Sequence, residues 1–245
     1  MVESCGIIRG PRVREQAEIH RHSGWLIPLG FFLVIAVLSA LFLAYYLRPL
    51  SGVFQGQRSG PAVETLNLGD MELTVPANYL ERSGTRRNNT DMVALFALLP
   101  DLRGFSAAEA ALFAGDAADS SLVHLLIRAD AKGLDSADRF ARIYRPNIVD
   151  AQGEAGPFGL TRYQFRADSG YGGQDLYAGI DAARGVLLLL CQRPAQDLPS
   201  PNCLAIDRPI APGLSLSYRF KRAQLARWRD ISAGVTALVS GFVRH

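Results

Sequence analysis

The sequence predicts an α+β fold: a single N-terminal transmembrane helix, then a domain with a mainly antiparallel sheet and a long C-terminal amphipathic helix. Three observations predict it. An uncharged apolar stretch lies near the N-terminus, short strand patterns follow with turns rich in Gly and Asp, and the last apolar residues recur three and four apart. Strands grouped together, with helices beside them rather than in strict alternation, are typical of this class.

The apolar stretch predicts a membrane span. The 23 residues from Trp25 to Leu47 carry no charge, and as a helix they reach about 35 Å, enough for a hydrocarbon core of roughly 30 Å. Trp25 at one end and Tyr45 and Tyr46 at the other suit the headgroup level. A cleaved signal peptide is the alternative, but the stretch exceeds the usual apolar region of about 7–15 residues. An uncleaved anchor is therefore favoured.

The flanking charges orient this span. Residues 1–24 contain four arginines, whereas two arginines follow the span closely. By the positive-inside rule, residues 1–24 are cytoplasmic, 25–47 cross the bilayer, 48–62 form a linker rich in Gly, Ser and Pro, and 63–245 form an extracytoplasmic domain. Arginine outnumbers lysine heavily and Ala and Gly are abundant, as in GC-rich bacterial genomes. We therefore expect a single-pass protein of a bacterial inner membrane with a periplasmic domain.

A stripe of small residues lies within the span. Ala36, Ala40 and Ala44 are four apart and share one helix face. Small residues at that spacing let two transmembrane helices approach closely. The stripe is a candidate helix-packing site, although Ala is common throughout the chain.

The first half of the domain begins with a hairpin. Val63–Leu68 and Met71–Val75 alternate apolar and polar residues around Gly69-Asp70. Met92–Leu99 is a nearly continuous apolar run, which predicts a buried strand, with a helix as the alternative. The spacing of Ser and Glu in Ser106–Glu109 fits a capping box and predicts a short helix that follows to about Ala114.

The second half predicts a strand, a helix, a meander and a final strand and helix. The helix Asp135–Arg145 ends at Pro146, and three strands then follow in close succession. The closing helix, from about Arg222 to Val243, places its apolar residues on one face. The expected strands are Ser121–Ala129, Leu160–Arg166, Asp175–Ile180, Val186–Gln192 and Leu214–Phe220.

Three segments resemble the PsbP-like fold, known from extrinsic proteins of photosystem II and from Ran-binding relatives. Met71–Tyr79 (MELTVPANY) is similar to its opening strand, with Tyr79 where Trp is more usual. Leu122–Tyr144 resembles its strand, turn and helix, and Phe158–Cys191 resembles its three hairpin-connected strands. The resemblance lies in the order of elements and not in a sequence motif. It implies an accessory or binding module that docks onto a larger assembly.

The resemblance has limits along the chain. The segment Pro194–Pro212 and the strand Leu214–Phe220 depart from the pattern and are expected to be additions. Cys191 and Cys203 flank the Pro-rich stretch RPAQDLPSP, and an even pair in an oxidising compartment favours a structural disulfide. Two buried thiols are the alternative.

Composition and motifs exclude several classes of function. A net charge of +3, spread evenly along the chain, gives no polycation for a nucleic acid. The chain has no G-x-S-x-G, H-E-x-x-H or P-loop motif. His124 is the one internal histidine of the domain and is expected to be a core residue, and the aspartates at 116–138 lack the order of a calcium loop. We therefore expect no catalytic residue, no metal and no cofactor.

A basic cluster near the start of the last helix is a candidate docking surface for an anionic partner, either an acidic protein face or lipid headgroups. A polar face on an amphipathic helix is the alternative. The cluster consists of Arg219, Lys221, Arg222, Arg227 and Arg229.

The expected function is that of a non-enzymatic accessory protein. An accessory subunit or assembly factor of an integral membrane complex fits the predicted anchor, and a periplasmic immunity or inhibitor protein that captures one protein target is a close variant. A module that binds a small ligand or an envelope component is the alternative, and it would require an apolar pocket.

Overall fold

The computed structural model describes residues 26–46, 62–81, 90–129, 134–181 and 185–244. The chain divides into two units, residues 1–52 and 53–245. The buried core residues of the described chain all lie in the second unit. Because it encloses its own core, the second unit has the properties of an independently folding domain.

The first unit contains helix α1 (Leu26–Tyr46). Over the residues that the structure describes, no helix meets the length and hydropathy that a membrane crossing requires. Membrane insertion therefore stays a prediction. Ala36 and Ala40 are exposed on α1, and the side chain of Ala44 lies outside the described part, so the packing role of this stripe is likewise a prediction.

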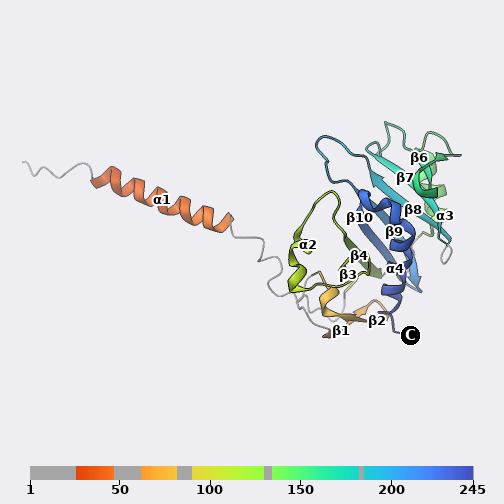
Figure 1. The fold of residues 1–245 in the computed structure, drawn as a ribbon, viewed down its shortest axis with the longest axis horizontal. Helices are drawn as coiled ribbons and strands as arrows, with labels where there is room; N and C mark the ends of the chain where they lie inside the picture. Colours follow the sequence, from red (N-terminus) through yellow and green to blue (C-terminus); the bar gives the residue numbers. More distant parts are fainter. Residues whose placement is uncertain (1–25, 47–61, 82–89, 130–133, 182–184, 245) are drawn as a thin grey trace, which may run out of the picture. The chain divides into compact units, whose positions relative to one another are not determined.

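The second unit is built on an eight-stranded antiparallel sheet (Figure 1). The meander β6–β7–β8 occupies one side, as the Gly-rich turns predict, and β10 lies between β4 and β9. In spatial order the strands are β3 (Met92–Leu98), β4 (Leu122–Ala129), β10 (Leu214–Lys221), β9 (Asn202–Ala211), β8 (Gly185–Gln192), β7 (Gln174–Asp181), β6 (Thr161–Gln164) and β5 (Glu154–Ala155). The α+β class and the antiparallel sheet are confirmed.

Strand β9 corrects the expectation that residues 194–212 form a Pro-rich addition. Its alternation is broken by a bulge, since Ile206 and Asp207 together face Ser217 of β10. Pro209 lies beyond the part of β9 that pairs with β8, so its missing N–H costs no bond to β8. The bulge shifts the side-chain alternation and turns Arg208 toward the face that carries the last helix.

The last helix covers one face of this sheet, here called the inner face. It starts as the 3-10 helix η7 (Arg222–Arg227) and continues as α4 (Trp228–Ser240). Its predicted apolar face is confirmed, since Trp228, Val235 and their apolar neighbours are buried. A Cβ added to Gly179 would lie 2.6 Å from the Trp228 ring, so glycine in β7 is what lets the indole lie on the sheet.

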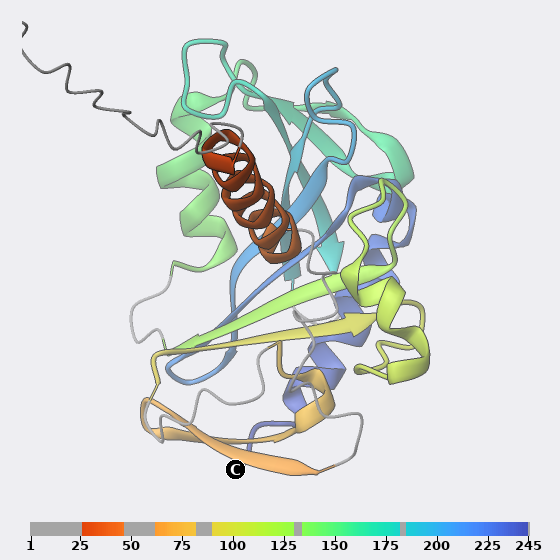
Figure 2. The same cartoon turned by 90° about the vertical axis from the view of Figure 1, so that its left-hand side faces the viewer.

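The opposite, outer face carries two separate caps (Figure 2). One cap consists of η3 (Ala107–Glu109) and α2 (Ala110–Ala114), and it buries an aromatic cluster against β3 and β4. The capping box expected there is wrong, because Ser106 makes no side-chain cap bond and Glu109 instead pairs with Arg103 at 2.8 Å.

The second cap lies over β6, β7 and β8. It consists of α3 (Ser136–Arg139), the π-helical turn η4 (Phe140–Tyr144) and η5 (Arg145–Asn147). The predicted helix is confirmed in position, and Asp135 caps it, since its Oδ1 accepts a hydrogen bond from the Asp138 N–H at 2.7 Å. This cap covers a second apolar cluster and leaves the centre of the outer face uncovered, and the 3-10 turn η6 (Pro157–Gly159) lies before β6.

The edges of the sheet are occupied by other backbone segments. At β3, the Glu81 N–H donates to Ala94 and the backbone of Arg103 bonds Leu98. At β6, Gln164 accepts from Val149. The predicted hairpin, β1 (Val63–Leu68) and β2 (Met71–Pro76), is confirmed, and the 3-10 turn η2 (Ala77–Tyr79) follows it. Residues 242–244 pair with β2. Blocked edges disfavour strand addition by a partner, so the faces are the surfaces left for binding.

Candidate binding surface

The uncovered centre of the outer face is the first candidate. In β10, Leu216, Tyr218 and Phe220 belong to the core under α4, so the intervening Arg219 points outward. Arg219 lies opposite His124 of β4 and Leu204 of β9, and Leu204 in turn lies opposite Leu190 of β8. Arg219 is exposed, and its apolar neighbours are half-buried. We call Leu126, Leu190, Leu204, Ile206 and Arg219 the central outer face.

Arg219 carries an unpaired charge. Among the residues that the structure describes, no carboxylate lies within ion-pair distance of its guanidinium. The nearby Lys221 is bound to Asp116, and its hydrogen bond holds the pKa of the Asp116 carboxyl below its usual 3.8. His124 Nδ1 lies 3.9 Å from Glu81. Burial, and then the charge of Arg219, lower the pKa of His124 below 6.5.

This lowered pKa predicts a pH dependence. Because the unfolded chain binds a proton at His124 more readily than the folded domain, stability is highest above pH 6.5 and falls as the pH drops through the folded pKa. We expect the unfolding temperature of residues 53–245 to fall between pH 7.5 and 5.5, and His124→Gln to reduce that slope. Thermal unfolding at several pH values measures both, and an identical slope in the variant would contradict the assignment.

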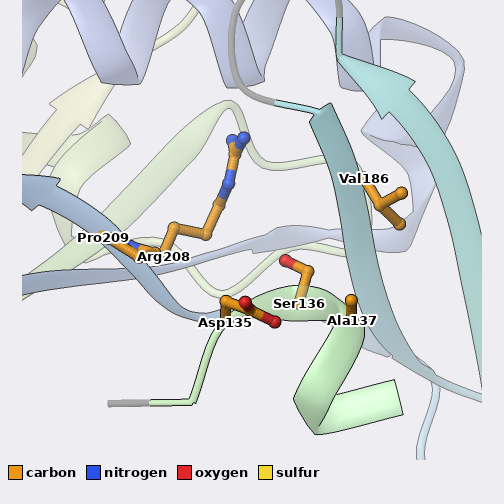
Figure 3. Close-up of a pocket in the computed structure, with 6 residues that line it drawn as sticks. All are labelled: Asp135, Ser136, Ala137, Val186, Arg208 and Pro209. Atoms are coloured by element: carbon orange, nitrogen blue, oxygen red, sulfur yellow. The ribbon is translucent and has the colours of Figure 1, made fainter. Parts of the chain in front are cut away.

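A groove beside α3 is the second candidate (Figure 3). It consists of two adjoining hollows of about 440 and 420 Å³ that share Ser136, Ala137 and Val186. The guanidinium of Arg208 points away from α3 and toward α4. It donates to Ser232 at 2.6 Å and to Asp181 at 3.2 Å, so its charge is neutralised inside the protein. The groove is therefore mainly apolar.

Large apolar side chains line and border this groove. Ile180 of β7 is 78% exposed, and its cross-strand partner Val186 is 44% exposed. Gly159 lines the same hollow as Ile180 and Val186. Phe158, the residue before Gly159, is 52% exposed. Its carbonyl accepts hydrogen bonds from Trp228 Nε1 at 3.2 Å and from Arg229 Nη1 at 3.1 Å. Sequence periodicity does not reveal this cluster, because Ile180 and Val186 fit ordinary buried strands and Phe158 precedes one.

Asp175 is the centre of a buried ionic network at the other end of β7. Its side chain is 2% exposed and accepts from Arg162 and Arg193 at 3.1 Å and from Arg222 at 3.2 Å. Arg222 also donates to the Tyr177 hydroxyl at 2.8 Å. The donors come from β6, from the segment after β8 and from η7, so one carboxylate holds three elements together.

The structure therefore separates the predicted basic cluster. Lys221 and Arg222 are engaged with Asp116 and Asp175, whereas Arg219 lies on the central outer face. Arg229 stacks over the Trp228 ring at 4.3 Å, and Arg227 is half-buried at the end of η7. A docking role for all five together stays a prediction.

The predicted cysteine pair is joined in the structure. Cys191 of β8 and Cys203 of β9 lie directly opposite each other, are fully buried and form a disulfide. Across the described ranges, no three His, Cys, Asp or Glu side chains are grouped so that they would hold a metal ion.

Comparison with known proteins gives a fold but no family. No family model matches the chain, and no curated protein matches it. Smlt3025, an immunity protein of the Stenotrophomonas maltophilia type IV secretion system, is similar with a TM-score of 0.52 and 15% identity over 76% of this chain and 94% of that chain. The Neisseria meningitidis lipoprotein FrpD gives a TM-score of 0.40 and 14% identity over 78% and 99%. The first similarity shows a shared fold.

Proposed function

We propose that this protein is a non-enzymatic binding protein of the bacterial envelope, of the immunity or inhibitor type, that captures one protein partner through its central outer face. The observation that carries the proposal is Arg219, an exposed guanidinium that has no ion-pair partner among the described residues and lies among half-buried leucines. Arginine is one of the residues that are enriched in binding hot spots. The fold shared with an immunity protein supports a binding role, and the blocked sheet edges favour recognition through a face.

The proposal includes the compartment. A buried disulfide in a domain of this size favours an oxidising environment, so we place residues 53–245 in the periplasm. We place residues 25–47 in the inner membrane as the anchor, on the strength of their uncharged sequence. The PsbP-like resemblance implies an accessory subunit of a membrane complex. That variant of the proposal differs only in its partner, which would be an integral membrane protein.

Affinity capture tests the proposal. The full chain, extracted gently in detergent with a tag joined to its C-terminus by a flexible linker, should retain one stoichiometric protein partner. Arg219→Glu should weaken capture about tenfold or more, because a reversed charge at the centre of an interface removes a hot-spot contact. Arg142→Glu is the matched control, since Arg142 is exposed on the α3 cap and pairs only with Asp138 among the described carboxylates.

Two outcomes would count against the proposal. One is a full chain that purifies with no stoichiometric partner from cells that encode its genomic neighbours. The other is equal retention of a partner by Arg219→Glu and Arg142→Glu, which would place the interface elsewhere.

A second candidate function, binding of a small ligand, is favoured by the groove beside α3. Its two hollows lie within the roughly 300–1,000 Å³ of ligand sites. The hydroxyls of Ser136, Thr161 and Tyr163 line the second hollow beside apolar side chains. Native mass spectrometry of the purified domain tests this candidate, which requires a bound small molecule that is lost in Ala178→Phe.

A further inference from the structure

The apolar edge of the groove forms a surface distinct from the central outer face. Ile180 and Val186 are cross-strand partners at the end where β7 leads into β8, and Gly159 lines the same hollow as both. Phe158 adds its half-exposed ring next to Gly159. We call Phe158, Ile180, Val186 and Arg229 the rim patch. These residues are related through Gly159, which lines the hollow with Ile180 and Val186, follows Phe158 in the chain, and would place an added Cβ 3.0 Å from Arg229 Nη2.

Phe158 is held in an unfavourable backbone conformation. Its φ is +57°, in the left-handed region that bulky residues rarely adopt. The hydrogen bonds from Trp228 and Arg229 to its carbonyl fix this turn. Because the ring is half exposed, burial of the ring does not explain the conformation. Strain of this kind is found at sites where a side chain must be presented in a fixed direction.

Arg229 supplies the charge of the rim patch. It is exposed, stacks on Trp228 and has no carboxylate within ion-pair distance among the described residues. The nearest charge along the helix is the exposed Asp230, and Asp181 at the end of β7 is neutralised by Arg208. An arginine beside exposed aromatic and aliphatic side chains matches the boundary between lipid headgroups and acyl chains.

The proposed anchor places a bilayer within reach of this surface. Residues 48–62 follow the span, and 15 residues extend to at most about 50 Å. We propose that the rim patch contacts the surface of the anionic phospholipid bilayer, with Phe158 and Ile180 entering the interface and Arg229 binding phosphate. The inference rests on the anchoring part of the proposed function, which makes a bilayer the constant neighbour of the domain.

Vesicle binding by residues 53–245 tests the inference. The domain should sediment with vesicles of equal parts phosphatidylglycerol and phosphatidylcholine, and more weakly with phosphatidylcholine alone, since a cation near the surface adds attraction to anionic lipid. Ile180→Asp should reduce binding about tenfold, because a charge replaces an inserted apolar side chain. Val149→Asp is the matched control, since Val149 is 69% exposed but lies beside the other end of β6.

Phe158→Gly separates binding from folding. Glycine accepts the left-handed conformation, so the unfolding temperature should stay the same or rise, while vesicle binding falls. A lower unfolding temperature together with weaker vesicle binding in Phe158→Gly would assign Phe158 a structural role.

Three results would overturn the lipid assignment: no sedimentation with anionic vesicles, equal sedimentation of Ile180→Asp and Val149→Asp, or loss of a captured protein in Ile180→Asp without any vesicle binding. The last would make the rim patch a protein interface. Carbonate extraction of the full chain tests the anchor separately, so failure of the anchor and failure of the patch are distinguishable.

Discussion

Replacing Asp175 with Asn should lower the free energy of unfolding of the domain by about 3–5 kcal/mol, the usual range when one partner of a buried ionic network is removed. Asp175 is the buried carboxylate that Arg162, Arg193 and Arg222 share. Without its charge, three guanidinium groups from different elements are left close together, and among the described carboxylates only Glu154, which pairs with Arg162, offsets them. The loss should exceed that of any single guanidinium donor.

Urea unfolding of residues 53–245, followed by tryptophan fluorescence, measures this effect because Trp228 is buried in the core. Asp168→Asn is the matched control. Asp168 also faces an arginine, Arg166, at 3.4 Å, but its side chain is 82% exposed. Exposed ion pairs contribute at most about 1 kcal/mol, so the free energy of unfolding should change little in Asp168→Asn. A loss below about 1 kcal/mol in Asp175→Asn would show that the network contributes little net stability.

The double substitution Cys191→Ala/Cys203→Ala should lower the free energy of unfolding by about 2–4 kcal/mol. The disulfide closes a loop of residues 12 apart in sequence, which restricts the unfolded chain. It also joins β8 to β9, whose pairing extends over only three residue pairs. Both sulfurs are fully buried, so the folded domain should resist reductant until it unfolds.

Mass after alkylation provides the control for this second result. The native domain should take up no alkylating reagent at Cys191 and Cys203 with reductant alone, and two equivalents when reductant and urea are combined. Free thiols in protein isolated from the periplasm would contradict the disulfide. Unchanged stability in the double variant would show that β8 and β9 hold their pairing without it.

Regular elements were predictable from the sequence, and irregular ones were not. β4 is a short apolar run, β10 alternates apolar and polar residues, and the apolar face of α4 repeats at helical spacing, so these residues indicate both the type of each element and its position. β9 escaped prediction because its bulge at Asp207 interrupts the alternation and Pro209 suggests a loop. Six residues of the last helix are 3-10 rather than α-helical, a difference of hydrogen bonding that side-chain spacing does not reveal.

The candidate surfaces depended on tertiary structure. Arg219, Lys221 and Arg222 are near neighbours in sequence and read as one basic cluster, yet only Arg219 keeps a free charge. The carboxylates that neutralise the other two are far away along the chain and meet them only through folding. In the same way, Ile180 and Val186 fit buried strands in the sequence, and their exposure follows from the place where the α3 cap ends.

The position of β10 between β4 and β9 sets the order in which the domain can be completed during synthesis. β3 and β4 leave the ribosome early, but the strand that pairs with the far side of β4 begins only at Leu214. The other side of β2 is paired later still, because it bonds to residues 242–244. A shortened translation product would therefore expose unpaired strand edges along its N-terminal half. Folding only after the whole domain has been released suits such a topology, and a truncated copy would be open to proteolytic cleavage.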